Sequence, residues 1–206
     1  MRIKICGLNP TRDVQTCIDL NVNYLGFVFY KKSPRNIDLK EISVLKKYNL
    51  KSSHYVSVCV NPINTFINEN ILGNFEYIQL HGEETVERVD EIKKMGLKVI
   101  KAIKVKDQKD IAIYKNYEDI ADLILFDSTS MEKSESIQKD LLYKLPKGKK
   151  FGLAGAINIE NIREYSQLGF NFLDLSSGLE RENLKGYKDH FKIKNFMNKI
   201  NEHKNK

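Results

Sequence analysis

The segment Asp122-Leu123-Ile124-Leu125-Phe126-Asp127 is a short apolar run that ends in an acidic residue. Apolar runs of this length are typical of the strands of a parallel sheet, which are buried on both faces. Eight short apolar runs that end near a chemically capable group occur in 206 residues, and a stretch with helical periodicity follows each run. The runs are residues 2–6, 24–29, 55–60, 77–80, 98–103, 122–126, 150–153 and 171–175. Eight alternating strands and helices predict one α/β domain over residues 1–206, a single (β/α)8 or TIM barrel.

Each predicted strand is followed by residues that can take part in binding or catalysis. In a (β/α)8 barrel the active site lies at the C-terminal ends of the strands, so we expect these residues to surround one site. They are Cys6-Gly7, Ser33-Pro34-Arg35, Asn61-Pro62, His81-Gly82, Lys104, Asp127, Ala154-Gly155 and Ser176-Ser177-Gly178. Asn9-Pro10 and Asn61-Pro62 also predict two helix starts, with asparagine as N-cap and proline at the first helical position.

The composition predicts a cytoplasmic protein without a membrane partner. Hydrophobic residues make up 41% of the chain, enough for one sizeable core, and no apolar stretch is long enough to span a bilayer. The chain enters a predicted strand at once, without a signal peptide. Its three cysteines, Cys6, Cys17 and Cys59, form no Cys-x-x-Cys pair, and the odd number argues against a disulfide framework.

The net charge of +7 is compatible with a polyanionic partner. However, the 34 lysines and arginines are spread over the predicted helix faces and the C-terminal segment, without a concentrated patch. No aromatic-plus-basic motif accompanies them. We therefore interpret the charge as solvated surface and expect no nucleic acid partner.

Motifs at the strand ends match one family in order and over nearly the whole chain. The matching segments are Lys4-Ile5-Cys6-Gly7, Gly26-Phe27-Val28-Phe29, Ser33-Pro34-Arg35, Val58-Cys59-Val60-Asn61, Gln79-Leu80-His81-Gly82, Lys101-Ala102-Ile103, Leu125-Phe126-Asp127, Leu153-Ala154-Gly155, Glu160-Asn161, Asp174-Leu175-Ser176-Ser177-Gly178-Leu179-Glu180 and Gly186-Tyr187-Lys188-Asp189. Together they resemble the phosphoribosylanthranilate isomerase family, (β/α)8 enzymes of tryptophan biosynthesis.

The resemblance implies an Amadori rearrangement of N-(5-phosphoribosyl)anthranilate to 1-(2-carboxyphenylamino)-1-deoxyribulose 5-phosphate. One general acid protonates the ribose ring oxygen, and one general base removes the proton from C2′. Because no redox change occurs, the resemblance implies neither a cofactor nor a metal. The expected partner is a small phosphorylated substrate.

The resemblance assigns Cys6 as the general base and Asp127 as the general acid. The alternative for Cys6 is a small buried hydrophobic residue, the role that we expect for Cys17 and Cys59. A base must be a thiolate, and Lys4 would help to lower the pKa of Cys6 if its side chain points into the barrel. The alternative for Asp127 is a helix N-cap, but the next predicted helix begins about ten residues later, near Ile137.

Three further residues are expected to bind substrate. The resemblance assigns Arg35, whose guanidinium can bind a carboxylate through two hydrogen bonds, to the anthranilate carboxylate; a surface arginine is the alternative. His81 resembles a residue that lines the pocket and has a supporting role. Asp174 either orients the ribose hydroxyls, which we favour, or bonds the neighbouring loop.

The loops after the last two strands are the expected phosphate site, because backbone N–H groups near a short helix N-terminus favour anions. The residues are Gly155, Ala156, Ser176, Ser177 and Gly178. Ala156 replaces a usual family glycine, and a positive φ is disfavoured there. Residues 128–139 also lack the glycines of the family's lid, so we expect this loop to stay open or to cover the substrate only partly.

Two other functions compete with the isomerase. A histidine-pathway sugar-phosphate isomerase is expected to carry an aspartate where this chain has Cys6, and it would show a half-barrel repeat, which is not visible here. A phosphosugar-binding module derived from the isomerase would not need both Cys6 and Asp127. We expect a monomer, because a small barrel needs no partner to close its core.

Overall fold

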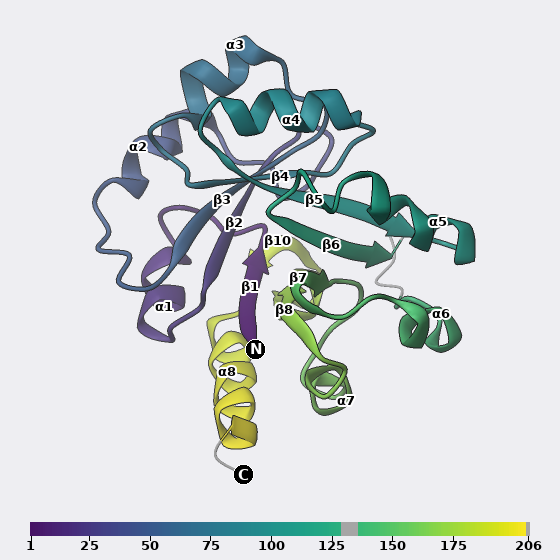
Figure 1. Cartoon of the computed structure of the whole chain (residues 1–206). Coiled ribbons are helices and arrows are strands. Elements are labelled where there is room, and N and C mark those ends of the chain that lie inside the picture. Colours follow the sequence, from purple (N-terminus) through teal and green to yellow (C-terminus); the bar gives the residue numbers. More distant parts are fainter. Residues whose placement is uncertain (129–135, 205–206) are drawn as a thin grey trace.

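Eight parallel strands form a closed barrel in the order β1 to β8, and β8 pairs with β1 (Figure 1). The computed structural model describes residues 1–128 and 136–204. The strands are β1 (Arg2–Cys6), β2 (Tyr24–Phe29), β3 (His54–Cys59), β4 (Tyr77–Leu80), β5 (Lys98–Val105), β6 (Leu123–Ser128), β7 (Gly148–Leu153) and β8 (Phe170–Leu175). All eight predicted runs overlap these strands, so the predicted (β/α)8 barrel is confirmed.

Helices and single helical turns follow the strands and cover the outside of the barrel (Figure 1). They are α1 (Val14–Asp19), α2 (Ile42–Leu45), α3 (Asn64–Phe66), α4 (Val86–Lys94), α5 (Gln108–Ala112), α6 (Lys139–Lys144), α7 (Ile162–Ser166) and α8 (His190–Lys204), with 3₁₀ turns η1 (Leu39–Glu41), η3 (Ile113–Asn116) and η4 (Ser177–Leu179) and a π-helical turn η2 (Ile67–Ile71).

Both predicted helix starts are wrong. The side chain of Asn9 accepts hydrogen bonds from two backbone N–H groups just downstream, but α1 itself begins only at Val14. Asn61 has a positive φ of 47°, and its side chain accepts a hydrogen bond from the backbone N–H of Glu83 at 3.0 Å. Asn61 therefore bonds to the next loop of the barrel instead of capping α3, which begins at Asn64.

Side chains alternate between two layers because successive residues of a strand face opposite sides of the sheet. One face of each strand packs under the helices, as Ile3 and Ile5 of β1 do. Inside the barrel, Tyr24 packs edge-on against Tyr77 and Phe172, with ring centroids 5.3 and 5.7 Å apart. These rings lie near the N-terminal ends of their strands and fill that half of the barrel. Polar interior side chains are thereby left at the C-terminal mouth.

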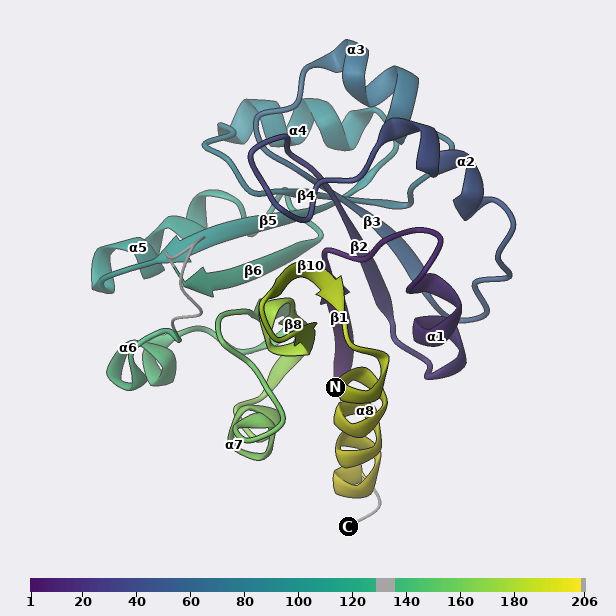
Figure 2. The ribbon, with the colours of Figure 1, turned by 180° about the vertical axis from the view of Figure 1, so that it is seen from behind.

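A hairpin of β9 (Glu180–Arg181) and β10 (Leu184–Lys188) follows η4 and lies at the tip of β1 in both views (Figures 1 and 2). Its position is fixed by a close contact, since a Cβ on Gly186 would lie 2.5 Å from the carbonyl oxygen of Pro34. Gly186 also has a positive φ of 83°. The hairpin thus joins the mouth of the barrel to the loop that carries Arg35.

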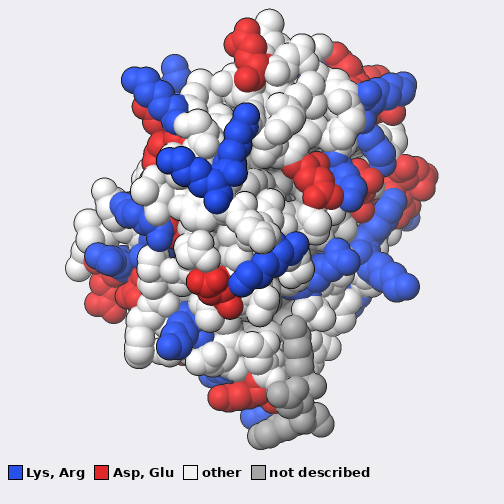
Figure 3. All heavy atoms as spheres, turned by 90° about the vertical axis from the view of Figure 1, so that its left-hand side faces the viewer, with Lys and Arg blue, Asp and Glu red and all other residues white. Residues whose placement is uncertain are grey.

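Charged side chains of both signs are interspersed on the face shown in Figure 3. This arrangement supports the interpretation of the net charge as solvated surface on that face. None of the described helices is long and apolar enough to cross a membrane.

Candidate active site

Lys4 of β1 points into the barrel and is fully buried. Its Nζ lies 2.7 Å from Oδ2 of Asp174 on the neighbouring β8. A Cβ on Gly26 would lie 3.2 Å from this Nζ and 3.4 Å from Sγ of Cys6. Glycine at this position therefore leaves room for the lysine and the thiol side by side. Burial lowers the pKa of Lys4, but the charges of Asp174 and Cys6 outweigh burial and raise it above its ordinary value, which keeps Lys4 an ammonium.

Cys6 is the last residue of β1 and is partly exposed at the mouth. Burial raises the pKa of its thiol above the ordinary value, although the Lys4 ammonium and, more weakly, Lys188 and Arg35 oppose the rise. The expectation of a lowered pKa is therefore wrong for the protein without substrate. Lys4 does lie beside the thiol, as that expectation requires, but desolvation changes the pKa of Cys6 more than the Lys4 charge does.

Cys17 and Cys59 are core residues, as the sequence predicts. Both are buried, Cys17 on the inner face of α1 and Cys59 at the end of β3. Burial raises the pKa of both thiols, so neither is favoured as a thiolate.

Asp174 is 7% exposed, and among the described residues only one of its carboxylate oxygens has a partner. Oδ2 accepts from Lys4, whereas Oδ1 is buried and has no hydrogen-bond partner among the described residues. Burial raises the pKa of Asp174, Lys4 opposes the rise, and the charge of Asp127 adds to it. A buried oxygen without a partner is costly, and an incoming hydroxyl group would satisfy it.

His81 and Asp127 face each other across the mouth. His81 follows β4 and Asp127 lies near the end of β6, with Nε2 of the imidazole 3.3 Å from Oδ2 of the carboxylate. Both side chains are 21% exposed, so a ligand can reach them. Asp127 does not cap α6, whose N-cap residue is Gln138. The N-cap alternative for Asp127 is thereby excluded.

Arg35 is held in place by Glu180. Its Nε and Nη2 donate to the two carboxylate oxygens at 2.6 and 3.0 Å, and its side chain is only 18% exposed. The aliphatic part of Arg35 packs on Gly7, where a Cβ would lie 2.5 Å from its Cδ. Arg35 is therefore a fixed residue beside Cys6 and not a free surface arginine.

Lys188 completes this cluster from β10. Its buried Nζ donates to the carbonyl oxygen of Ser176 at 3.0 Å and to Oε1 of Glu180 at 3.1 Å. Burial opposes ionisation of Glu180, but Arg35 and Lys188 outweigh it and hold the pKa of that carboxyl below its ordinary range. Sequence reasoning assigned no role to Glu180 or Lys188. Their place in the matching motifs was the only signal, because nothing local shows that they are buried.

The two expected phosphate loops form one continuous surface. A Cβ on Gly178 would lie 2.4 Å from the carbonyl oxygen of Ile157, so the loop after β8 rests on the loop after β7. Gly155 and Ala156 have φ values of 103° and 48°. Ala156 thus adopts the conformation that is disfavoured for alanine, and Asn161 Nδ2 bonds its carbonyl oxygen at 2.9 Å.

Ser176 and Ser177 lie where β8 meets the short turn η4. The Ser176 hydroxyl donates to the carbonyl oxygen of Cys6 at 3.2 Å, and η4 begins at Ser177. These contacts bring the predicted phosphate loop to the end of β1. The glycine-free segment expected to replace the lid falls mostly outside the described residues, which stop at Ser128 and resume at 136. In the described part of the chain no three His, Cys, Asp or Glu residues are grouped so as to hold a metal ion.

Comparisons with known proteins agree on one family. Residues 3–199 match the family model described as N-(5′-phosphoribosyl)anthranilate isomerase. A protein of that name from Aquifex aeolicus is 35% identical, over 96% of this chain and 97% of its own length. The crystal structure of phosphoribosyl anthranilate isomerase from Thermotoga maritima superimposes with a TM-score of 0.85 at 28% identity, covering 98% and 99% of the two chains.

Two further structures of such isomerases add a ligand and an assembly. One, with a TM-score of 0.81 and 28% identity over 98% of this chain and 99% of its own, is a complex with reduced 1-(o-carboxyphenylamino)-1-deoxyribulose 5-phosphate. The other, from T. maritima, has a TM-score of 0.80 at 28% identity and covers 98% of this chain and 99% of its own. It is described as monomers generated from a dimeric enzyme.

Proposed function

The chain belongs to the N-(5′-phosphoribosyl)anthranilate isomerase family, and on that premise we propose that Cys6 and Asp127 are the base and the acid of the isomerisation. The substrate is N-(5-phosphoribosyl)anthranilate, and the product is 1-(2-carboxyphenylamino)-1-deoxyribulose 5-phosphate, an intermediate of tryptophan biosynthesis. One observation carries the assignment: a thiol and a carboxyl group stand at the same mouth, beside the ion pair of Lys4 and Asp174.

The acid acts first in this proposal. Protonated Asp127 gives its proton to the ribose ring oxygen, the bond from that oxygen to C1′ breaks, and the nitrogen lone pair forms the Schiff base. His81, at 3.3 Å from Asp127, is close enough to stabilise the carboxylate that remains. His81 is thus a supporting residue and not itself the acid.

The base completes the rearrangement. The Cys6 thiolate removes the proton from C2′, and the electron pair of that bond moves toward the nitrogen to give an enolamine, which tautomerises to the ketone. The cost of forming the thiolate is lowered by the Lys4 ammonium, the largest charge that opposes the effect of burial. The orphan oxygen of Asp174 accepts a hydrogen bond from a ribose hydroxyl and orients the sugar.

The two ends of the substrate are bound by different parts of the mouth. We assign the anthranilate carboxylate to Nη1 of Arg35, because Glu180 already binds Nε and Nη2. The phosphate lies against backbone amides of residues 155–156 and 176–178, which the contact at Gly178 joins into one surface. In this proposal each end of the substrate binds where the family resemblance assigns it, the carboxylate at Arg35 and the phosphate at the loops after the last two strands.

An assay of the fluorescent substrate tests the function. Freshly generated phosphoribosylanthranilate loses fluorescence as it rearranges, and we expect the purified protein to accelerate the loss. Cys6→Ser and Asp127→Asn should each lower kcat by about 100-fold or more with the fold retained. An unchanged kcat in either variant would show that the wrong group is assigned, and no acceleration by the native protein would favour a binding module.

We also propose that the protein is a monomer in a reducing compartment. The barrel closes within one chain, which supports a monomer, although the T. maritima relative is described as dimeric. Sedimentation at the assay concentration distinguishes the two. The three free cysteines support a reducing compartment such as the cytoplasm.

A further inference from the structure

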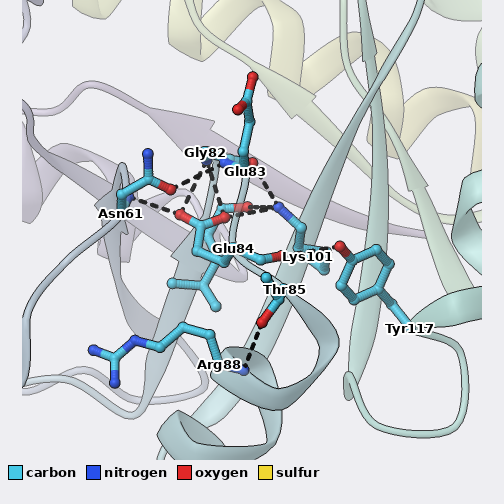
Figure 4. A network of polar contacts seen from close by, with 9 residues as sticks. Asn61, Gly82, Glu83, Glu84, Thr85, Arg88, Lys101 and Tyr117 are labelled. Carbon is cyan, nitrogen blue, oxygen red and sulfur yellow. Dashed lines mark hydrogen bonds and ion pairs between the residues drawn. The ribbon is translucent and has the colours of Figure 1, made fainter.

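Another buried lysine–carboxylate pair joins β5 to the segment that follows β4, as the close view of Lys101 and Glu84 shows (Figure 4). Nζ of Lys101 on β5 lies 2.7 Å from Oε2 of Glu84, and the two side chains are 4% and 1% exposed. None of the proposed reaction steps uses this pair. Because burying two charges costs several kcal/mol per ion, a pair of this kind is weak evidence for stability and requires another explanation.

The pair binds the peptide groups that surround Gly82. Glu84 accepts hydrogen bonds from the N–H of Gly82 at 3.1 Å and from the N–H of Asn61 at 2.8 Å. Lys101 donates to the carbonyl oxygen of Gly82 at 2.8 Å. Both polar groups of the residue after His81 are therefore bonded to the same ion pair, as Figure 4 shows for its labelled members.

A side chain at Gly82, in the centre of this cluster, would displace the side chains of Asn61 and Glu84. A Cβ on Gly82 would lie 2.3 Å from Oδ1 of Asn61 and 2.8 Å from Oε1 of Glu84. The Asn61 side chain in turn accepts from the N–H of Glu83 at 3.0 Å, and the Tyr117 hydroxyl donates to the Glu84 carbonyl oxygen at 2.9 Å. Segments that follow β3, β4 and β5 are thus joined at Glu84, through its carboxylate to Asn61 and through its backbone carbonyl oxygen to Tyr117.

His81 is the residue whose backbone this cluster fixes. Its own N–H donates to the carbonyl oxygen of Cys59 at 2.9 Å, and the next peptide group is bonded to Glu84 and Lys101. The imidazole projects from this fixed backbone to within 3.3 Å of Asp127. A small rotation of the Gly82 peptide would change this distance, and misplacement by about 1 Å can cost two orders of magnitude in rate.

We propose that Glu84 and Lys101 are positioning residues that hold His81 against the acid Asp127. The inference rests on the proposed role of Asp127, but the position of His81 can be measured without any reaction. In Glu84→Gln and Lys101→Met the His81 ring loses its fixed place. We expect kcat to fall about tenfold while KM stays within about twofold, because neither residue touches the substrate.

A double-mutant cycle separates positioning from general damage. If Glu84 acts through His81, Glu84→Gln has no further effect on kcat in a chain that already carries His81→Asn. A purely structural role predicts that the two losses multiply, and that result would overturn the proposal. Asp122→Asn is the matched control, since Asp122 also accepts a backbone N–H, from Val99 at 2.8 Å, and a lysine, Lys93 at 3.1 Å, but at the opposite end of the barrel.

The second readout is the NMR signal of the His81 ring, one of four histidines, which the His81→Asn variant assigns. It should shift in Glu84→Gln and stay in place in Asp122→Asn; an unshifted signal in Glu84→Gln refutes the proposal. If Glu84→Gln does not fold, Asn61→Gly keeps the ion pair and the positive φ while removing the bond to Glu83, and the same two readouts decide. A native protein that shows the His81 shifts but no isomerisation would refute the proposed function alone.

Discussion

Two of the buried lysine–carboxylate pairs, Lys4–Asp174 and Lys101–Glu84, have the same N–O distance, 2.7 Å, and opposite surroundings. Glu84 receives backbone N–H groups as well as Lys101, and these together outweigh burial and hold its pKa below the ordinary value. Asp174 receives Lys4 on one oxygen and has no described partner on the other, and burial raises its pKa. Both carboxylate oxygens of Glu84 therefore accept hydrogen bonds, whereas Oδ1 of Asp174 is available to accept one from a ligand.

The difference shows how one chemical pair serves two purposes. Where the backbone supplies the remaining hydrogen bonds, a carboxylate fixes loops and is saturated. Where it does not, the buried oxygen without a partner destabilises the folded protein until a ligand donates a hydrogen bond to it. Glu84→Ala and Lys4→Met test this contrast directly, and Arg35→Ala and Ala156→Gly, with smaller expected effects, test residues elsewhere in the candidate site.

The largest effect is expected for Glu84→Ala. Removing one partner of a buried pair leaves the Lys101 charge uncompensated, so the free energy of unfolding should fall by about 3–5 kcal/mol at neutral pH. Because the pKa of Glu84 is lowered in the folded state, its contribution is present above the unfolded value of 4.5 and is lost as the pH falls below it. Urea unfolding across this range should show the gap to the native chain narrowing in acid; a constant gap contradicts the assignment.

Lys4→Met should lower kcat by about 100-fold and change its pH dependence. The pKa of Cys6 is already raised, so kcat/KM of the native enzyme should increase with pH on the alkaline side as the thiolate forms. Without the Lys4 charge the thiolate is less stable, and this increase should move to still higher pH. Lys101→Met is the control, since it should leave the position of the increase unchanged; an identical shift in both variants would remove the contrast between the pairs.

Arg35→Ala should mainly raise KM for phosphoribosylanthranilate, by about tenfold, because a charge-assisted pair to the carboxylate is lost. Inhibition by a sugar phosphate without the anthranilate ring should hardly change. Steady-state kinetics with both ligands checks this. Equal weakening of the two would place Arg35 at the phosphate instead.

Ala156→Gly should have the smallest effect, a stabilisation of about 1 kcal/mol or less. Its φ of 48° strains alanine and not glycine, although glycine loses more backbone entropy on folding. Thermal unfolding measures the net result of these two opposing effects. A destabilised variant would show that the methyl group packs usefully in the loop.

The sequence predicts the barrel well because each strand is a local pattern. Ile124-Leu125-Phe126 can be recognised as buried without any knowledge of its neighbours, and so can the polar residue that ends it. The helix starts at Asn9 and Asn61 were wrong for the converse reason. Asn61 bonds to a residue 22 positions away, and that contact outweighs its local capping preference.

The sequence predicted the place of several candidate residues at the barrel mouth, but it missed Glu180 and Lys188 and predicted none of the pairings. Family motifs pointed to Cys6, Arg35, His81, Asp127 and Asp174, and the structure brings their strand ends to one mouth. The partner of each residue lies far away in the chain and leaves no local trace. The net direction of the Cys6 pKa could not be predicted either, because it depends on how far burial outweighs Lys4.

The separation of Lys4 and Asp174 by 170 residues has a consequence during synthesis. A domain is made from its N-terminal end at about 5–20 residues per second, so β1 leaves the ribosome many seconds before β8 does. Until then the ammonium of Lys4 has no carboxylate to pair with and stays in water, outside any core. The surroundings of Cys6 are therefore completed last, and in a nascent chain that stops short of β8 this thiol lacks both the neighbouring Lys4–Asp174 pair and the burial that raises its pKa.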